Sequence, residues 1–428
     1  MRSLARRSNM TRIEADVIVV GGGPSGIAAA VAMKQRGVGR VVIIEREPVL
    51  GGVPRHCGHP PFGMREFGRV MTGPRYAERL ARYAIEHGVE ILTRTTVVAL
   101  EQDGVLRIAS HSGQGVARAS RVVLATGVRE MPRSARLISG DRPLGVVNTG
   151  ALQAYVYLQG LTPFRRPVIV GTELVALSAL LTCRKAGIRP TAMLEENCRP
   201  TTYRAFMGLP RMLGVPVHYA SRIEAIHGSH RVDAVTVRQE DGKVRTLACD
   251  GVLFTGRFTP ESTLVRTSHL ELDDGTQGPQ IDQFGRCTDS TYYAAGNLLR
   301  PVETAGWSFR EGRRIGHCVA DDLLGIMPRA QHVVKIERTE GIKLVVPQRI
   351  SLPSTAQGLA QLQVRVTRQA RGSLNVNNGR STLWQSRKHL LPERRVLIPM
   401  PQIALEDDLD ALSVGIQSAS ADAPFSRG

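Results

Sequence analysis

The sequence has few cysteines and few aromatic residues, and it lacks any long apolar run. Its six cysteines include no Cys-x-x-Cys pair and no cluster with histidine at metal-ligand spacing, so we expect reduced thiols and no metal. No apolar stretch approaches the roughly 18 residues that cross a bilayer. The N-terminus has no apolar core of the kind that a secretory signal needs, so we expect a cytoplasmic protein without an integral membrane segment. A basic transit peptide stays open, although Met10 is another candidate initiator.

Acidic residues are also scarce, with 38 Asp and Glu against 56 Lys and Arg, and the net charge is +18. Such a charge attracts nucleic acids, anionic membrane surfaces or acidic substrates. The arginines are spread along the whole chain without a nucleic-acid motif, so we expect no nucleic-acid partner and leave peripheral membrane association open. With 42% apolar residues and 43 glycines, the 428 residues are typical of a globular α/β protein of two or three domains.

A strand, a glycine turn and an alanine-rich helix are predicted for residues 16–33. In this context Gly21 allows a tight turn, Gly23 lets the backbone approach a diphosphate, and Gly26 lets the helix pack closely on the strand. The diphosphate would lie at the N-terminus of the helix, where free N–H groups and the helix dipole favour negative charge.

A second apolar strand follows and ends in Glu45. An acid about 20 residues after the glycines is placed to accept hydrogen bonds from ribose hydroxyls. Strand, glycine turn, helix, strand and acid stand in the required order. The first part of the chain is therefore predicted to bind a dinucleotide.

Three later segments resemble flavoproteins with two dinucleotide-binding folds, of the pyridine nucleotide-disulfide oxidoreductase type. Residues 122–127 (VVLATG) are similar to the strand and turn after the β-meander of the FAD domain. Residues 290–297 resemble the late motif beside the ribityl chain of the flavin, with Asn297 where that family usually has Asp. Residues 301–316 resemble the closing helix, whose N-terminus can stabilise negative charge on reduced flavin. An amide still donates and accepts hydrogen bonds, so we expect FAD binding to survive the change.

The resemblance implies a set of FAD-binding residues at matching motifs. They are Gly21, Gly23, Pro24, Ser25, Gly26, Glu45, Arg46, Gly52, Val97, Ala125, Thr126, Gly127, Gly296 and Asn297.

A second strand, turn, helix and strand occupy residues 167–195, at the position of the NAD(P)H domain in that family. Gly171 and Glu195 are spaced like Gly21 and Glu45, so they are the candidate NAD-binding residues, and a carboxylate favours NADH over NADPH. Glu173, however, stands where the first turn has Gly23, and its side chain and charge would crowd a diphosphate. Two interpretations stay open: a domain that binds NADH, and a domain kept for packing or for a partner protein.

Residues 50–63 lie where disulfide reductases of this family place two redox cysteines, but only Cys57 is present. A dithiol reductase is therefore disfavoured. Cys57 and His56 are the candidate catalytic residues, because a neighbouring imidazolium lowers the pKa of a thiol. The alternative is a loop, also containing His59, that only packs over the cofactor.

The same loop and residues 71–80 are similar to FAD subunits that accompany glycerol-3-phosphate dehydrogenases. They are also similar to FAD subunits of heteromeric amine, opine and glycine (cyanide-forming) dehydrogenases. The resemblance implies an FAD-dependent oxidoreductase of dehydrogenase or oxidase type that moves electrons between an amine, amino acid or hydroxy compound and an acceptor. A partner subunit is possible. The alternatives are an NADH-dependent flavin reductase that passes electrons to a partner protein, and a non-catalytic FAD-containing relay or assembly subunit.

The pattern changes to period two near residue 331, where Leu362, Val364 and Val366 alternate with polar residues and Asn378-Gly379 indicates a hairpin. This module has no cysteine, so no iron–sulfur cluster is expected in it. The predicted fold is α/β, an FAD-binding Rossmann-like domain with a nested second one, plus a small all-β module. The expected parts are FAD-binding residues 13–150 and 251–330, nested residues 151–250, β-rich residues 331–417 and a disordered tail, 418–428.

Overall fold

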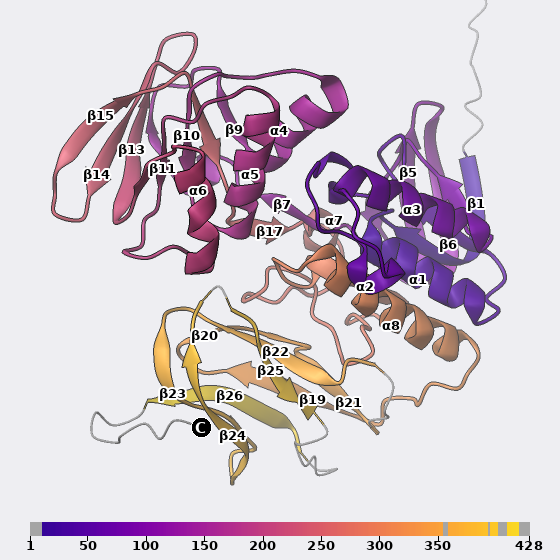
Figure 1. Cartoon of the computed structure of the whole chain (residues 1–428). Helices are drawn as coiled ribbons and strands as arrows, with labels where there is room; N and C mark the ends of the chain where they lie inside the picture. The colour runs from indigo at the N-terminus through magenta and orange to yellow at the C-terminus, as the bar shows by residue number, and fades with distance from the viewer. Residues whose placement is uncertain (1–10, 354–357, 393, 401–408, 419–428) are drawn as a thin grey trace, which may run out of the picture. The chain divides into compact units, whose positions relative to one another are not determined.

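The computed structural model describes residues 11–353, 358–392, 394–400 and 409–418 (Figure 1). The predicted basic start and all of the predicted tail except Ser418 lie outside these ranges. The chain groups into two compact units. The first comprises Met1–Gly52, Arg79–Val128 and Pro260–Gly428, and the second Val53–Glu78 and Arg129–Thr259. The second unit thus includes residues 53–78 and 129–150, which the sequence-based division places in the first domain.

The first unit is built on a mainly parallel sheet in the order β3-β2-β1-β6-β5-β4, with β18 beside β6. Strand β1 pairs in parallel with β2 and β6, and β18 also runs parallel to β6. Residues 17–20 are buried, as expected for a parallel strand covered on both faces. The strands are β1 (Thr11–Val20), β2 (Val41–Ile44), β3 (Glu90–Leu92), β4 (Thr95–Leu100), β5 (Val105–Ser110), β6 (Gly113–Leu124) and β18 (Tyr292–Ala294).

Two helices, α1 (Pro24–Gln35) and α8 (Ala305–Leu323), lie side by side in this unit (Figure 1). Their backbones approach closely because glycines of α8 face small residues of α1. A Cβ on Gly312 would lie 2.1 Å from the Ser25 carbonyl oxygen, and one on Gly316 would lie 2.4 Å from that of Ala29. Three short helices also lie wholly in this unit: η2 (Gln102–Gly104), α7 (Thr263–Arg266) and η6 (Gly296–Leu298).

The second unit contains a parallel sheet in the order β12-β11-β10-β16-β9 and an antiparallel sheet β15-β14-β13 with β8 at its edge. The central strand β10 is fully buried and is followed directly by a turn and the helix α5, as the sequence predicts. The strands are β8 (Ser139–Gly140), β9 (Val146–Asn148), β10 (Pro167–Val170), β11 (Ala192–Leu194), β12 (Val217–His218), β13 (Ser221–His227), β14 (Ala234–Gln239), β15 (Val244–Ala248) and β16 (Gly251–Phe254).

The helices of this unit are mostly short. They are η1 (Val53–His56), α2 (Met64–Phe67), η3 (Ser134–Arg136), α4 (Thr149–Ala154), the π-helix η4 (Tyr155–Gln159), α5 (Leu174–Lys185), η5 (Arg204–Met207) and α6 (Gly208–Met212). Helix α3 (Gly73–Glu86) and the paired strands β7 (Val128–Glu130) and β17 (Phe258–Pro260) contain points where the chain changes unit.

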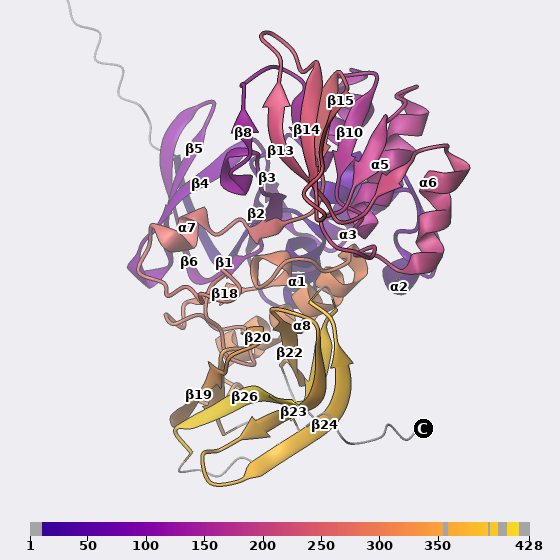
Figure 2. The ribbon, with the colours of Figure 1, turned by 90° about the vertical axis from the view of Figure 1, so that its left-hand side faces the viewer.

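The C-terminal module is all-β, which confirms the predicted architecture of two Rossmann-like folds and a β module. One sheet has the order β21-β19-β26-β23-β24 and the other β20-β22-β25, and strands of this module are shown in Figure 2. Both sheets contribute side chains to one apolar core. The strands are β19 (His332–Arg338), β20 (Ile342–Val346), β21 (Arg349–Leu352), β22 (Gln361–Val366), β23 (Ala370–Asn377), β24 (Thr382–Leu390), β25 (Val396–Pro399) and β26 (Ala411–Ser418). The predicted hairpin at Asn378-Gly379 joins β23 to β24. Gln363, expected to alternate to the outside, is instead buried.

Replacing Gly312 by alanine tests the close contact of α1 and α8. Alanine normally stabilises a helix interior by about 1 kcal/mol over glycine. Here the methyl group would overlap the Ser25 carbonyl, so we expect a net loss of about 2 kcal/mol in the free energy of unfolding, measured by urea denaturation. Gly208→Ala, whose added Cβ meets nothing within 4 Å, is the control and should not lose stability. Equal stability of Gly312→Ala and the wild type would contradict this packing.

Candidate functional site

Parallel strands of the first unit end level with one another at one edge of the sheet. Val20 is in register with Ile44 and with Leu124, which is in turn in register with Ala294. Ligands of open α/β sheets bind in the crevice outside the carboxyl ends of the strands. The residues that follow these strand ends are Gly21, Glu45, Ala125 and Ala295. The structure therefore brings the predicted residues Gly21, Glu45 and Ala125 to one edge of the sheet, and Ala295 there directly precedes the predicted Gly296.

The three glycines of the first turn have different reasons to lack a side chain. Gly21 has φ +108°, and a Cβ there would lie 2.5 Å from the Ala125 carbonyl oxygen. A Cβ on Gly26 would lie 2.0 Å from the Gly21 carbonyl oxygen. A Cβ on Gly23 would meet only the Cα of Gly52, at 3.9 Å. The fold itself requires the first two glycines, whereas at Gly23 it leaves a space of the kind that a diphosphate needs.

The N-terminus of α1 fits an anion. Its N-cap residue is Gly23, Pro24 follows, no side chain caps the helix and its first turn holds no acidic residue. Gly51 donates its N–H to the Gly22 carbonyl at 2.8 Å, which holds the loop containing Gly52 against the turn. An uncapped helix N-terminus presents N–H groups and a partial positive charge to a bound phosphate.

Glu45 is held in place at the end of β2. Its side chain is buried, and its two carboxylate oxygens accept hydrogen bonds from the N–H groups of Gly22 (2.8 Å) and Glu47 (2.9 Å). The Glu45 carbonyl accepts from the Thr95 N–H at 3.1 Å, which places the start of β4, and with it the buried Val97, beside this strand end. Arg46, in contrast, is exposed.

Thr126 and Gly127 are hydrogen-bonded to Glu261, just after the chain returns to the first unit at Pro260. The Thr126 hydroxyl donates to the Glu261 carbonyl at 2.8 Å, and the Glu261 N–H donates to the Gly127 carbonyl at 2.9 Å. These bonds fix the turn after β6. Ser262, the next residue, is buried, and its hydroxyl has no hydrogen-bond partner in the described part of the chain.

Gly296 lies against the start of α1, and Asn297 follows it in the chain. Gly296 has φ +77°, and a Cβ there would lie 2.4 Å from the Ser25 hydroxyl oxygen. The Asn297 amide bridges a loop, since its Nδ2 donates to the Glu303 carbonyl (3.1 Å) and its Oδ1 accepts from the Glu303 N–H (2.7 Å). A carboxylate could not donate to that carbonyl, which gives a physical reason for Asn where the resembling family has Asp. The second Nδ2 hydrogen and the second Oδ1 lone pair remain for a ligand.

Buried polar groups near the start of α8 give a further test of fit to FAD. Among the described residues, the Ser308 hydroxyl and the Trp307 indole N–H have no hydrogen-bond partner. The Cβ of Ser308 lies 3.8 Å from the position that a Cβ on Gly296 would take. Buried polar groups are normally paired, so unpaired ones beside a predicted site are candidates to bind a ligand. The space at Gly23, the uncapped helix and these groups together fit FAD.

The second glycine turn does not fit a dinucleotide in the same way. The Glu173 carboxylate lies over the turn: a Cβ on Gly171 would be 2.4 Å from its Oε2, and one on Gly256 would be 2.4 Å from its Oε1. The Thr255 hydroxyl donates to Glu173 Oε2 at 2.7 Å. Burial raises the pKa of Glu173, an effect that this hydrogen bond partly offsets. The side chain fills the place that corresponds to the open space at Gly23.

The carboxylate of Glu195, the second candidate NAD residue, already accepts hydrogen bonds from nearby residues of the protein. Its Oε1 accepts from the N–H (2.9 Å) and the side-chain amide (2.6 Å) of Asn197. Its Oε2 accepts from the hydroxyl groups of Thr172 and Thr201, the latter at 3.1 Å. Donors of the protein thus take the positions that ribose hydroxyls would need.

Cys57 and His56 belong to the second unit, whereas the first glycine turn belongs to the other. The Cys57 thiol lies 3.5 Å from the Val53 carbonyl oxygen and 3.5 Å from the side-chain oxygen of the buried Gln153. Burial raises the pKa of this thiol to about 12, and the negative charge of Glu130 adds to the shift. Burial of the thiol thus acts in the direction opposite to the lowered pKa that a neighbouring imidazolium would give.

Glu130 is a buried acid that no sequence motif indicates. One of its oxygens accepts from the Gly150 N–H at 2.7 Å, and the other has no hydrogen-bond partner among the described residues. Burial raises the pKa of its carboxyl to about 7. Such a group can exchange a proton near neutral pH, which is the property that a general acid or base needs.

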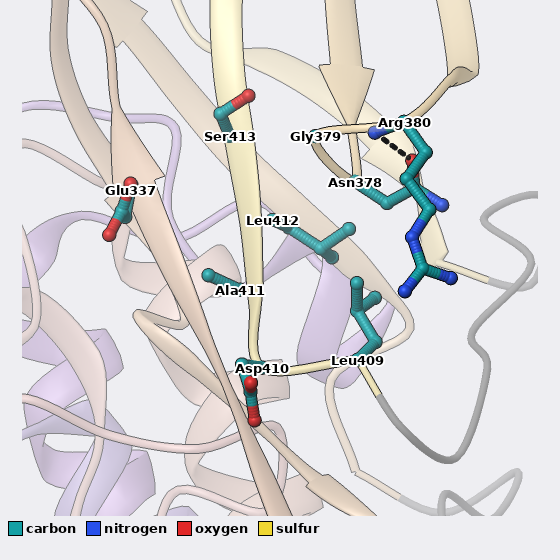
Figure 3. Close-up of a pocket in the computed structure, with 9 residues that line it drawn as sticks. All are labelled: Glu337, Asn378, Gly379, Arg380, Leu409, Asp410, Ala411, Leu412 and Ser413. Carbon is teal, nitrogen blue, oxygen red and sulfur yellow. Dashed lines mark hydrogen bonds between the residues drawn. The ribbon is translucent and has the colours of Figure 1, made fainter.

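A pocket in the C-terminal module is separate from the predicted site residues. Figure 3 shows Arg380 and Leu409 on one side of it, Glu337 on the other, and Ala411 of β26 between them. It contains none of the residues predicted to bind FAD or NAD.

Comparison with known proteins places the chain in a family. The model of the pyridine nucleotide-disulphide oxidoreductase family matches residues 15–312. The chain belongs to this family. The resemblance noted from the glycine motifs is thereby confirmed, and the matched range includes both glycine turns.

Several proteins similar to this chain are subunits or components of larger enzymes by name. The alpha chain of a sarcosine oxidase from Rhizobium meliloti (strain 1021) is 25% identical over 362 residues, which cover 78% of this chain and 33% of the relative. The ferredoxin reductase component of a chlorobenzene dioxygenase from Cupriavidus sp. (strain PS12) is 26% identical over 314 residues, covering 70% and 69%. An opine oxidase subunit from Agrobacterium tumefaciens (strain Ach5) is 25% identical over 314 residues, covering 66% and 61%. The chain therefore spans only about a third of the sarcosine oxidase relative.

A solved structure supports the fold. Thioredoxin reductase of T. acidophilum superposes on this chain with a TM-score of 0.61 at 19% identity. The match covers 73% of this chain and 99% of the thioredoxin reductase chain. In the described residues, no helix is long and apolar enough to span a membrane.

Glu130 makes stability depend on pH. Its folded pKa of about 7 is above the ordinary value of 4.5, so the stabilisation is complete below pH 4.5 and is lost as the pH rises towards about 7. The loss is on the order of 3 kcal/mol. We expect Glu130→Gln to remove this slope between pH 5 and pH 8 in urea denaturation, while Glu240→Gln at an exposed position keeps it. A slope that survives in Glu130→Gln would contradict the assignment.

Proposed function

We propose that this chain is an FAD-dependent oxidoreductase that transfers electrons from a small organic substrate to an acceptor as one subunit of a complex. The first glycine turn carries this proposal. It combines a space at Gly23, the uncapped start of α1 and the buried acid Glu45 at the edge where the strands end. The cytoplasmic location expected from the sequence is part of the same proposal.

The relatives support the substrate class and the role within a complex. The sarcosine oxidase and opine oxidase relatives are both subunits by name, and their names refer to oxidation of amine compounds. We therefore favour an amine or amino acid as the substrate, with hydroxy compounds as the wider class. Electrons would pass to a partner protein or another acceptor.

Each part of the site has a role in this proposal. When bound, FAD supplies the hydride-accepting chemistry. The N–H groups at the start of α1 hold the diphosphate, with Gly23 giving room for it, and Glu45 orients the ribose. At the other end, Asn297 and the Ser308 hydroxyl would hydrogen-bond the flavin in this proposal, and the N-terminus of α8 would favour negative charge there.

The alternatives differ in where the electrons come from. The ferredoxin reductase relative favours a chain that takes electrons from NADH for a partner protein. Glu173 argues against this role, because it fills the second turn. A dithiol reductase is disfavoured because residues 50–63 hold a single cysteine with a raised thiol pKa. A non-catalytic relay protein would bind FAD but would not be reduced by any small substrate.

Gly23→Ala tests the flavin site. The added methyl group has room in the protein alone but would stand in the path of the diphosphate. We expect normal folding by circular dichroism and a rise of at least about tenfold in the Kd for FAD, which corresponds to about 1.4 kcal/mol. Gly208→Ala serves as the control in a titration of apoprotein with FAD followed by flavin fluorescence. Unchanged FAD affinity in Gly23→Ala would contradict the proposed site.

Glu173→Gly tests the electron source. In the wild type, anaerobic NADH should leave the flavin absorbance oxidised, because the Glu173 side chain fills the second turn. Removal of the side chain should expose the turn and produce measurable NADH binding by quenching of protein fluorescence. Glu173→Gln keeps the shape of the side chain and should stay inert towards NADH. Rapid bleaching of the wild-type flavin by NADH would refute the closure of the second turn and favour the reductase alternative.

A further inference from the structure

The C-terminal module, β19 to β26, is hydrogen-bonded to the rest of the first unit through buried polar groups. Gln283 and Ser351 exchange two bonds, with the Gln283 amide donating to the Ser351 carbonyl (2.7 Å) and its oxygen accepting from the Ser351 N–H (2.8 Å). The Ser351 hydroxyl donates to Asp282 at 2.9 Å. All three side chains are buried. The module is therefore integrated into the unit that carries the first glycine turn.

One chain of hydrogen bonds leads from this module to Gly296. Gln363 of β22 accepts from the Arg300 Nε at 2.8 Å. Arg300 forms a two-bond ion pair with Glu311 of α8, at 3.0 and 2.5 Å. The Gly296 N–H donates to Glu311 at 2.9 Å. Arg300, Glu311 and Gln363 are each at most 5% exposed, so this chain is shielded from water and strengthened by the low dielectric around it.

A second chain leads from the module to Asn297. Arg365 of β22 donates to Glu303 at 3.3 Å, and Arg395, directly before β25, also donates to the Glu303 carboxylate. The backbone of Glu303 is in turn bonded to both ends of the Asn297 amide. Both chains therefore end at the two residues that the sequence assigns to the flavin end of the site.

The start of α8 beside these chains has features of a ligand site. The Arg395 guanidinium carbon lies 3.7 Å from the centre of the Trp307 ring. The indole N–H of that tryptophan and the hydroxyl of the 95% buried Ser308 lack hydrogen-bond partners in the described residues. Unpaired buried donors next to an arginine and a helix N-terminus suit an electron-rich ligand edge.

We propose that the C-terminal module is a positioning element for the flavin, an inference that rests on the proposed function. Gln363 holds Gly296 through Arg300 and Glu311, while Arg365 and Arg395 hold Asn297 through Glu303. The cluster has three guanidinium groups and two carboxylates, so it retains net positive charge beside the start of α8. That charge favours the electron-rich form of the flavin and thus a higher reduction potential.

Two variants on the module test this inference. Gln363→Leu removes the acceptor for Arg300, and Arg395→Gln removes a charge from a side chain that is 24% exposed and therefore tolerant of change. Arg371→Gln, at an exposed position of β23, is the matched control. Each full-length variant is compared with the wild type for its Kd for FAD, flavin absorbance spectrum, midpoint potential and far-UV circular dichroism.

Both variants should raise the Kd for FAD roughly tenfold, as for loss of one hydrogen bond to a charged group, and should alter the flavin spectrum. Arg395→Gln, which also removes a positive charge, should in addition lower the midpoint potential. Arg371→Gln should match the wild type. The inference is overturned if Gln363→Leu and Arg395→Gln change only thermal stability while FAD affinity, spectrum and potential stay at wild-type values. If Gln363→Leu fails to fold, Arg395→Gln decides. A wild-type chain that binds no FAD would instead refute the proposed function itself, and the inference with it.

Discussion

In the first unit, four parallel strands end at the same level, and the arrangement of the predicted site depends on this. Because Val20, Ile44, Leu124 and Ala294 share one register, the segments that follow them meet at one edge although they are far apart in the sequence. Close backbone contact then holds the helices to this edge. Gly26 packs on the Gly21 carbonyl and Gly312 on that of Ser25, so the uncapped start of α1 lies close to the strand ends.

The two glycine turns show how one side chain changes the use of a shared architecture. Both follow a buried parallel strand, and both are paired with an acid at the end of the next strand. In the first turn Gly23 leaves room above the helix N-terminus. In the second, the Glu173 carboxylate occupies the turn, and Thr172, Thr201 and Asn197 satisfy Glu195. The second turn thus supplies from its own side chains the negative charge and the hydroxyl groups that a bound dinucleotide would bring.

The sequence predicts those features that depend on local contacts. The roles of Gly21 and Gly26 follow from a turn and a helix that are adjacent in the chain, and the period-two pattern of residues 362–366 predicts β22. Gln363 breaks that pattern because it is buried to accept a hydrogen bond from Arg300, which is 63 residues away in the sequence. The hydrogen bond from Gly296 to Glu311 likewise joins residues that no motif links. The thiol pKa of Cys57 depends on burial, which its neighbours in sequence do not reveal. Long-range packing, not motif spacing, therefore determines the parts of the site that sequence reasoning misses.

The amount of flavin bound per chain is the decisive quantity for the first glycine turn. The protein, purified and incubated with excess FAD, is freed of unbound flavin by gel filtration and then denatured, and the released flavin is quantified against the polypeptide and identified by chromatography. We expect one FAD per chain, held at the first glycine turn. A chain that retains no FAD would contradict the assignment of that turn, and two dinucleotides per chain would contradict the closure of the second turn by Glu173.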